Sequence, residues 1–154
     1  MPAKPNIWIV DTSVFLNVLD VPIFNQNRAQ ILALFEQRIQ AGDSFLLPFT
    51  TILESGNHIA QLNDGNQRRR FSIQFSNMVL QSLAGEAPWK PLGFPTEELL
   101  KEWLPDFPDE AVRSVGLGDH MIIKQWENQC VLFGAYAVRI WSLDQDLQGY
   151  ECNT

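Results

Sequence analysis

Short apolar runs alternate with helical patterns along the chain, and this alternation constrains the fold more than any other feature. The runs NIWIV (6–10), SFLLPF (44–49) and VRIWSL (138–143) are rich in residues that favour strands. QNRAQILALFEQRIQAG has apolar residues at helical spacing and stops at Gly42, a residue type common just after a helix. Strands that alternate with helices predict an α/β fold with a largely parallel sheet, covered on both faces.

The rest of the chain predicts further helices and one irregular stretch. Helical patterns occur in TSVFLNVLD, TTILESGNHIAQLNDG, NQRRRFSIQFSNMVLQSLAG, TEELLKEWL, DEAVRSV and GDHMIIKQWENQ. The second of these opens with Thr51-x-x-Glu54, the spacing of a capping box. APWKPLGFP, within a Pro- and Trp-bearing insert around 86–108, is expected to hold only a short extended piece. At 154 residues, 45% of them apolar, the chain fits a single domain, 1–154.

Composition limits the compartments in which the protein is expected and the partners that it is expected to bind. Cys130 and Cys152 are not spaced as a metal-binding pair, so reduced thiols in the cytoplasm are the simpler interpretation, with a disulfide left open. No apolar run approaches the roughly 18 residues of a membrane span, and MPAKPN lacks the apolar core of a signal peptide. The sequence therefore predicts a cytoplasmic protein without a membrane partner. The net charge of −7 argues against general affinity for nucleic acids, unless part of the acidity belongs to a metal site.

Four acidic residues recur at the ends of apolar runs or at the starts of predicted helices. Asp11 and Asp144 end strands, while Glu54 and Asp119 lie in first helical turns. Each of them alone has a structural explanation as a helix cap. In a parallel sheet, however, the loops that leave the strands gather at one edge, where such folds bind ligands. We therefore expect the four carboxylates to converge, and Asp146, two residues past Asp144, is placed to join them.

Converging carboxylates repel one another, so a positive charge must compensate them. Mg²⁺ and Mn²⁺ prefer oxygen ligands, whereas zinc sites are built mainly from Cys and His, which this pattern does not contain. Carboxylate-bound metals with open water positions are suited to the hydrolysis of phosphodiesters. The sequence shows no motif for a Ser or Cys nucleophile that would point to another hydrolytic mechanism. The pattern thus predicts a metal-dependent phosphodiesterase.

Four segments in order, VDTSV (10–14), TILE (51–54), GDHMII (118–123) and SLDQD (142–146), resemble the motifs of the PIN domain family, and most closely its VapC-like ribonuclease toxins. The resemblance covers the whole chain. It implies a three-layer α/β/α sandwich and a Mg²⁺- or Mn²⁺-dependent endoribonuclease with a two-metal-type site. The implied catalytic residues are Asp11, Glu54, Asp119 and Asp144, the metal ligands Asp11, Asp119, Asp144 and Asp146, and the supporting residues Ser13 and Ser142. A homodimer, and an antitoxin protein that reaches into the acidic pocket, are implied as partners besides RNA.

Other residues have both functional and structural interpretations. A basic run on the fourth predicted helix is a candidate RNA contact, with a solvated helix face as the alternative: Arg68, Arg69 and Arg70. His58 and His120 are interpreted as surface or packing residues. The tryptophans are expected in the core or in interfaces, and Trp89 and Trp103, in the insert, are the candidates for contact with a partner.

Two alternatives to a ribonuclease remain open. The first is a catalytically inactive PIN-like module that binds RNA or a protein partner. The second is phosphoryl transfer of the haloacid-dehalogenase kind, which also begins from an Asp after a first strand. That chemistry requires a second Asp two residues further on, where this chain has Ser13.

Overall fold

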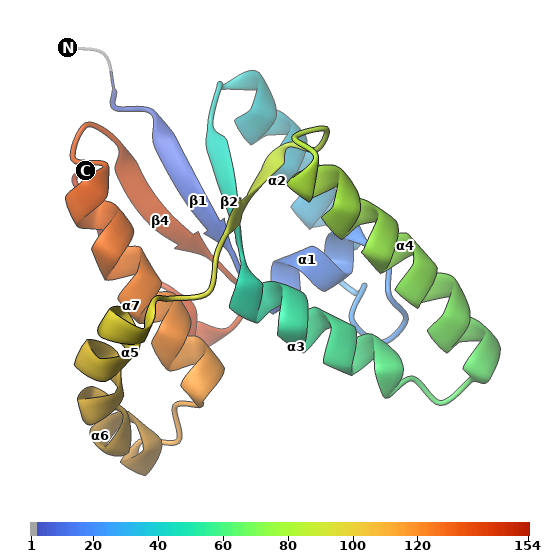
Figure 1. The fold of residues 1–154 in the computed structure, drawn as a ribbon. Helices are drawn as coiled ribbons and strands as arrows, with labels where there is room; N and C mark the ends of the chain where they lie inside the picture. Colours follow the sequence, from blue (N-terminus) through green and yellow to red (C-terminus); the bar gives the residue numbers. More distant parts are fainter. Residues whose placement is uncertain (1–2) are drawn as a thin grey trace.

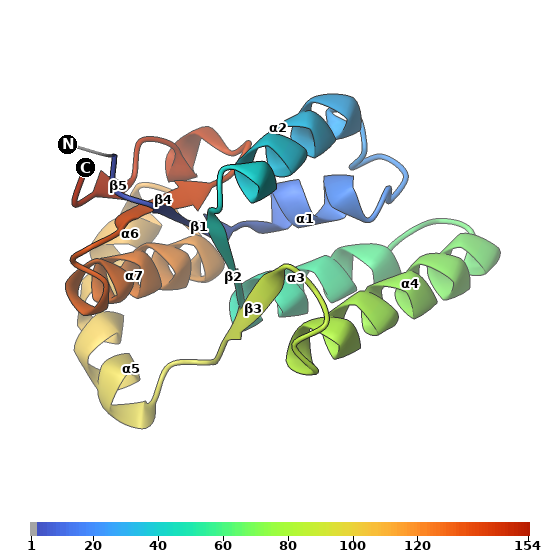
Figure 2. The ribbon, with the colours of Figure 1, turned by 90° about the horizontal axis from the view of Figure 1, so that it is seen from above.

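A computed structural model describes residues 3–154, and in this part of the chain one sheet forms the centre of the fold. The strands lie in the order β3-β2-β1-β4-β5; Figure 1 labels β1, β2 and β4, and Figure 2 labels all five. Their bounds are β1 Asn6–Val10, β2 Ser44–Pro48, β3 Trp89–Leu92, β4 Ala137–Trp141 and β5 Glu151–Cys152. The first four are parallel and β5 pairs antiparallel with β4. The predicted α/β class with a mainly parallel sheet is confirmed.

Helices cover both faces of the sheet. They are α1 Thr12–Val18, α2 Arg28–Gln40, α3 Phe49–Ala60, α4 Gly65–Leu83, α5 Glu97–Trp103, α6 Phe107–Val112 and α7 Leu117–Leu132, with short 3-10 helices at Leu104–Asp106 and Gln145–Leu147. Figures 1 and 2 show α5–α7 grouped apart from α1–α4. Among residues 3–154, no helix is both long and apolar enough to cross a membrane.

Side chains alternate between the two faces of the sheet along each strand, so the core is divided into two parts. Ile7 and Ile9 of β1 pack with Ile122 of α7, on one face of the sheet. Trp8 and Val10 pack on the other face, together with side chains from α1–α4. Successive residues of a strand point to opposite faces, so a strand that is buried on both sides is apolar throughout. This explains why NIWIV is a continuous apolar run.

The capping box predicted at Thr51 and Glu54 is wrong. Helix α3 already begins at Phe49, directly after Pro48 ends β2. The Thr51 hydroxyl donates instead to the Val10 carbonyl at 2.7 Å and is fully buried. Thr51 therefore makes a tertiary contact with β1, and Glu54 accepts a hydrogen bond from Thr12 of α1, so neither side chain serves the cap that the local spacing predicted.

The Pro-rich stretch contributes an edge strand to the sheet and does not form a partner surface around its tryptophans. Trp89 begins β3 and is 1% exposed, and its ring stacks on Phe35 with centroids 4.5 Å apart. Trp103 ends α5 and is 6% exposed. The prediction that these two residues contact a partner is wrong, because both rings are buried within the fold, Trp89 in the core beside the sheet and Trp103 next to α7.

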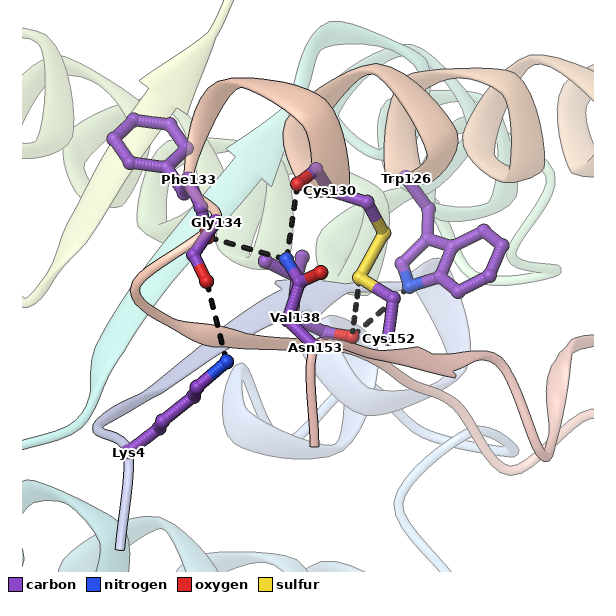
Figure 3. Close-up of a disulfide and its surroundings, with 8 residues drawn as sticks. All are labelled: Lys4, Trp126, Cys130, Phe133, Gly134, Val138, Cys152 and Asn153. Atoms are coloured by element: carbon purple, nitrogen blue, oxygen red, sulfur yellow. Dashed lines mark hydrogen bonds between the residues drawn. A yellow bond between two sulfur atoms is a disulfide. The ribbon is translucent and has the colours of Figure 1, made fainter.

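The C-terminal residues, expected to form a tail, include β5, which carries a disulfide. Cys152 of β5 is bonded to Cys130 of α7, with their Cα atoms 6.1 Å apart (Figure 3). Asn153 donates to the Cys130 carbonyl at 2.9 Å beside this bond. The interpretation of two reduced thiols is wrong, because antiparallel pairing with β4 brings residues distant in sequence together. Disulfides persist mainly in oxidising compartments, so the argument for a cytoplasmic location is weakened.

Removing the disulfide is expected to destabilise the fold. The two cysteines are 22 residues apart in sequence, and a crosslink closing a loop of this size contributes roughly 3 kcal/mol by restricting the unfolded chain. Urea unfolding of Cys152→Ser should therefore show a free energy of unfolding lower by about 2–3 kcal/mol. A thiol reductant should reproduce the loss in the wild type and change nothing in the variant. Equal stability of both proteins would contradict the prediction.

Candidate metal centre

The sheet order creates a crevice between β1 and β4. From β1 the chain proceeds through β2 and β3 on one side, while β4 lies on the other side, so this is the topological switch point at which such sheets bind ligands. Asp11 follows β1 directly, and its backbone N–H donates to the Trp141 carbonyl at the end of β4. Figure 2 shows α1 continuing from this end of β1. Asp11 and the loop after β4 are therefore neighbours.

The Asp11 carboxylate is held by two serine hydroxyls. Its Oδ2 accepts hydrogen bonds from Ser142 Oγ at 2.7 Å and Ser13 Oγ at 3.0 Å, and the residue is 4% exposed. The hydroxyls in turn accept from the backbone N–H groups of Leu143 and Asp144, each at 2.9 Å. Asp11 occupies the N-cap position of α1, but within residues 3–154 its side chain makes no capping bond there, so capping does not account for this carboxylate.

Glu54 reaches the same place from α3. Its Oε2 accepts a hydrogen bond from Thr12 Oγ1 at 3.0 Å. On its other side it lies against the backbone of α7, where a Cβ atom on Gly118 would be only 1.8 Å from Oε1. Burial is the main factor that raises the pKa of Glu54, the Thr12 bond opposes this effect, and the charge of Asp11 adds to it.

Three further carboxylates form a cluster beside these two. Oxygen atoms of Asp119, Asp144 and Asp146 lie within 4.8 Å of one another. Asp144 Oδ1 accepts from the Asp146 backbone N–H at 2.9 Å, which places both carboxylates at the start of the 3-10 helix after β4. Burial raises the pKa of Asp119 to about 7, and the nearby charges of Asp11, Asp144, Glu54 and Asp146 add to the effect. The cluster therefore has an uncompensated negative charge.

All four acids predicted from the sequence line one cleft of about 210 Å³. Two of them lie in helices, Glu54 in α3 and Asp119 in α7, and two lie directly after or just beyond strands, Asp11 after β1 and Asp144 after β4. Asp146 joins them through its contacts with Asp119 and Asp144. The expected convergence thus occurs, and no single helix or loop could have produced it.

The cleft fits a hard divalent cation. The clustered side chains of Asp119, Asp144 and Asp146 offer only carboxylate oxygens, and Asp144 and Asp146 are exposed. Mg²⁺ and Mn²⁺ bind such ligands and retain water in their remaining positions. The raised pKa of Asp119 is itself a sign that this group of carboxylates favours an added positive charge, from either a proton or a metal ion.

Sequence reasoning missed several residues of the cleft. Thr12, Phe24 and His58 all line it. The interpretation of His58 as a surface or packing residue omits its place in the cleft. Its position four residues after Glu54, on the same face of the helix, is the sequence signal for that place. Gly118 also matters, because it leaves room for the Glu54 side chain, and its position directly before Asp119 was the signal for it in the sequence. The contribution of Phe24 had no signal, because it depends on the path of the loop between α1 and α2.

The basic run at the start of α4 does not line this cleft. Arg68 Nη1 donates to the Leu62 carbonyl at 2.6 Å and the Asn63 carbonyl at 3.1 Å, beyond the end of α3. The guanidinium of Arg70 lies 5.2 Å from the centre of the Phe71 ring. His120 is buried, with Nε2 2.9 Å from the Trp103 carbonyl, in agreement with a packing role.

No family model matches the chain, and no curated protein sequence matches it. The fold and the cleft define an α/β protein with a carboxylate-rich site at the switch point of its sheet.

Proposed function

We propose that this protein is a metal-dependent endoribonuclease of the PIN domain family. The observation that carries this proposal is the meeting of Asp11, Glu54, Asp119 and Asp144 in one cleft at the carboxyl ends of parallel strands. A site composed of carboxylates, without an arranged Ser, Cys or His nucleophile among its lining residues, favours hydrolysis assisted by Mg²⁺ or Mn²⁺. The order of the four sequence motifs points to RNA phosphodiesters as the substrate.

Asp119, Asp144 and Asp146 would hold the cation, with Asp11 beside them. A bound cation would supply Lewis acidity toward a phosphate oxygen and lower the pKa of a bound water molecule. The residues around it provide orientation: Ser13 and Ser142 hold the Asp11 carboxylate in one position. Catalysis of phosphodiester hydrolysis depends largely on such positioning and on electrostatic stabilisation.

The biological role that we propose is that of a VapC-like toxin. This extension rests on the resemblance of the motifs, together with the implied antitoxin and homodimer. The net charge of −7 makes a negatively charged cleft a natural target for a partner with basic side chains. Analysis of the neighbouring reading frame tests the role, because a small protein with a DNA-binding end would mark a toxin–antitoxin pair.

Cleavage and metal binding should be measured on the same preparation. Single-stranded RNA incubated with the protein should be cut in the presence of Mn²⁺ and remain intact with EDTA. Calorimetric titration with Mn²⁺ should show binding to the wild type, and weaker binding to the Asp119→Asn variant. Binding of RNA without either cleavage or metal binding would refute the proposal and favour the inactive PIN-like module.

Replacing Gly118 with alanine is expected to lower activity while largely preserving the fold. The added methyl group would collide with Glu54 Oε1, and the flexible Glu54 side chain can escape only by leaving its position beside Thr12. The cleavage rate should fall about ten-fold or more, in line with the loss of one positioned group. Gly116→Ala is the control, since a Cβ atom there meets nothing within 4 Å. Equal activity of both variants would contradict this role of Gly118.

A further inference from the structure

The cleft has an aromatic end as well as an acidic one. Phe24, from the connection between α1 and α2, and His58, from α3, line the cleft together with Asp11 and Asp119. The centroids of the two rings are 4.9 Å apart and the ring planes are tilted by 51°. Both side chains remain partly exposed. Two aromatic rings from different segments therefore form a wall of the cavity that holds the carboxylates.

His58 is placed at this wall by the register of α3. It follows Glu54 by four residues, and side chains with this spacing lie on the same face of a helix. The face that presents Glu54 to the acids therefore presents His58 one turn further along. The aromatic wall and the acidic end are thus held at a constant separation by one rigid helix.

The backbone before Phe24 adopts an unusual conformation. Ile23 has a φ of +76° and is 65% exposed. A β-branched residue in this left-handed region is strained, and such strain persists mainly where surrounding structure requires it, often at functional sites. The Ile23 side chain is largely exposed, and the turn that this conformation makes leads directly into Phe24, which lines the cleft.

Polar contacts fix this connection in place. Asn25 Nδ2 donates to Asp20 Oδ1 at 3.0 Å, and Arg28 Nε lies 3.6 Å from the same oxygen. The Asn27 backbone N–H donates to Asn17 Oδ1 at 3.1 Å. The position of the Phe24 ring is therefore set before any substrate arrives, which reduces the entropy lost on binding.

We propose that Phe24 and His58 hold an unpaired nucleobase next to the phosphate that is cleaved, as a single-stranded form of the RNA substrate would present it. This inference rests on the ribonuclease function proposed above. Bases stack on aromatic side chains irrespective of sequence, and a base in a duplex has both faces covered by its neighbours. Stacking also supplies an attraction that carries no charge, in a protein whose net charge of −7 repels phosphates.

Substitutions can separate stacking from simple packing. Phe24 also packs against buried residues of the core, a contact that leucine preserves without an aromatic face. Phe24→Leu and His58→Ala should therefore raise the apparent KM, whereas Phe24→Tyr and His58→Phe should remain close to the wild type. Stacking of one base corresponds to a rise of about 5- to 160-fold in KM, with little change in kcat.

The probe is a fluorescein-labelled RNA oligonucleotide of random sequence, tested with Mn²⁺ as a single strand and as a duplex with its complement. We expect the wild type to cleave the single strand and spare the duplex. Phe94→Leu is the matched control, because this ring is 54% exposed and contacts Phe49 away from the cleft.

Four outcomes would overturn the inference. If Phe24→Leu matched the wild type in KM, the residue would be packing only; if His58→Phe were as impaired as His58→Ala, a ring nitrogen rather than a ring face would matter. Equal cleavage of single strand and duplex would refute the substrate class, while leaving the nuclease intact. A wild type that cleaves neither RNA would refute the proposed function and this inference with it.

Discussion

Replacing Asp119 with asparagine is expected to lower the rate of RNA cleavage by roughly a hundred- to a thousand-fold or more. The residue shares the cleft with Asp11, Glu54 and Asp144, and its carboxylate oxygen belongs to the cluster that fits a cation. An amide preserves the shape of the side chain but removes the negative charge. The loss should appear in kcat with Mn²⁺ at saturating RNA, and calorimetry should show weakened metal binding.

The fold should survive this substitution, because Asp119 belongs to a cluster of carboxylates that repel one another in the absence of a cation, and asparagine removes part of this repulsion. Circular dichroism of Asp119→Asn should therefore match the wild type. Glu36→Gln, which removes one charge on the exposed side of α2, is the control and should leave cleavage unchanged. Full activity of Asp119→Asn would refute the assignment of the cleft as the catalytic site.

Stability without added metal is expected to decrease as the pH rises from about 4 to about 7. The unfolded chain holds Asp119 at its ordinary pKa of about 3.9, whereas burial and neighbouring carboxylates raise the pKa to about 7 in the folded protein. The folded protein therefore binds more protons between these values, and its free energy of unfolding falls as the pH rises through this window.

The size of this effect is limited by solvent. A three-unit shift would correspond to about 4 kcal/mol, and because the carboxylate is only partly buried, screening reduces the expected contribution to roughly 1–2 kcal/mol. The midpoint of thermal unfolding should fall accordingly, by roughly 2–8 °C. Asp119→Asn should show a smaller decrease over the same pH range.

Mn²⁺ should reverse the loss of stability above the pKa of Asp119. The metal binds the deprotonated carboxylates and only the folded protein assembles them, so the rise in melting temperature should be larger near pH 8 than near pH 5.5. Thermal unfolding at both pH values, with Mn²⁺ and with EDTA, measures the difference. A rise that is independent of pH, or that persists in Asp119→Asn, would place the bound metal elsewhere.

The positions of the acids could be predicted from the sequence because each is tied to a local signal. Asp11 follows a buried strand, and Asp119 lies in the first turn of a helix, so a parallel sheet places both at one edge. The strands β1 and β2 could also be predicted from a local signal, because each is a short continuous apolar run. Short-range patterns of this kind need no knowledge of the packing.

Features that depend on neighbours distant in the chain could not be predicted. The spacing of Thr51 and Glu54 indicated a cap, but their partners are Val10 and Thr12, about 40 positions away in sequence. Strand β5 is two residues long and is defined only by its pairing with β4. No periodicity reveals such a strand, and the disulfide that it carries was equally hidden.

The α/β class and the carboxylates at strand and helix ends could be inferred from the sequence alone, because hydrophobic periodicity and helix-start signals are properties of consecutive residues. Knowledge of the tertiary structure was needed for the remaining contacts: it places Glu54 against Gly118, brings Phe24 and His58 to the wall of the cleft, and brings Cys130 and Cys152 into bonding distance. These contacts arise from the packing of helices against both faces of the sheet, which no local pattern specifies.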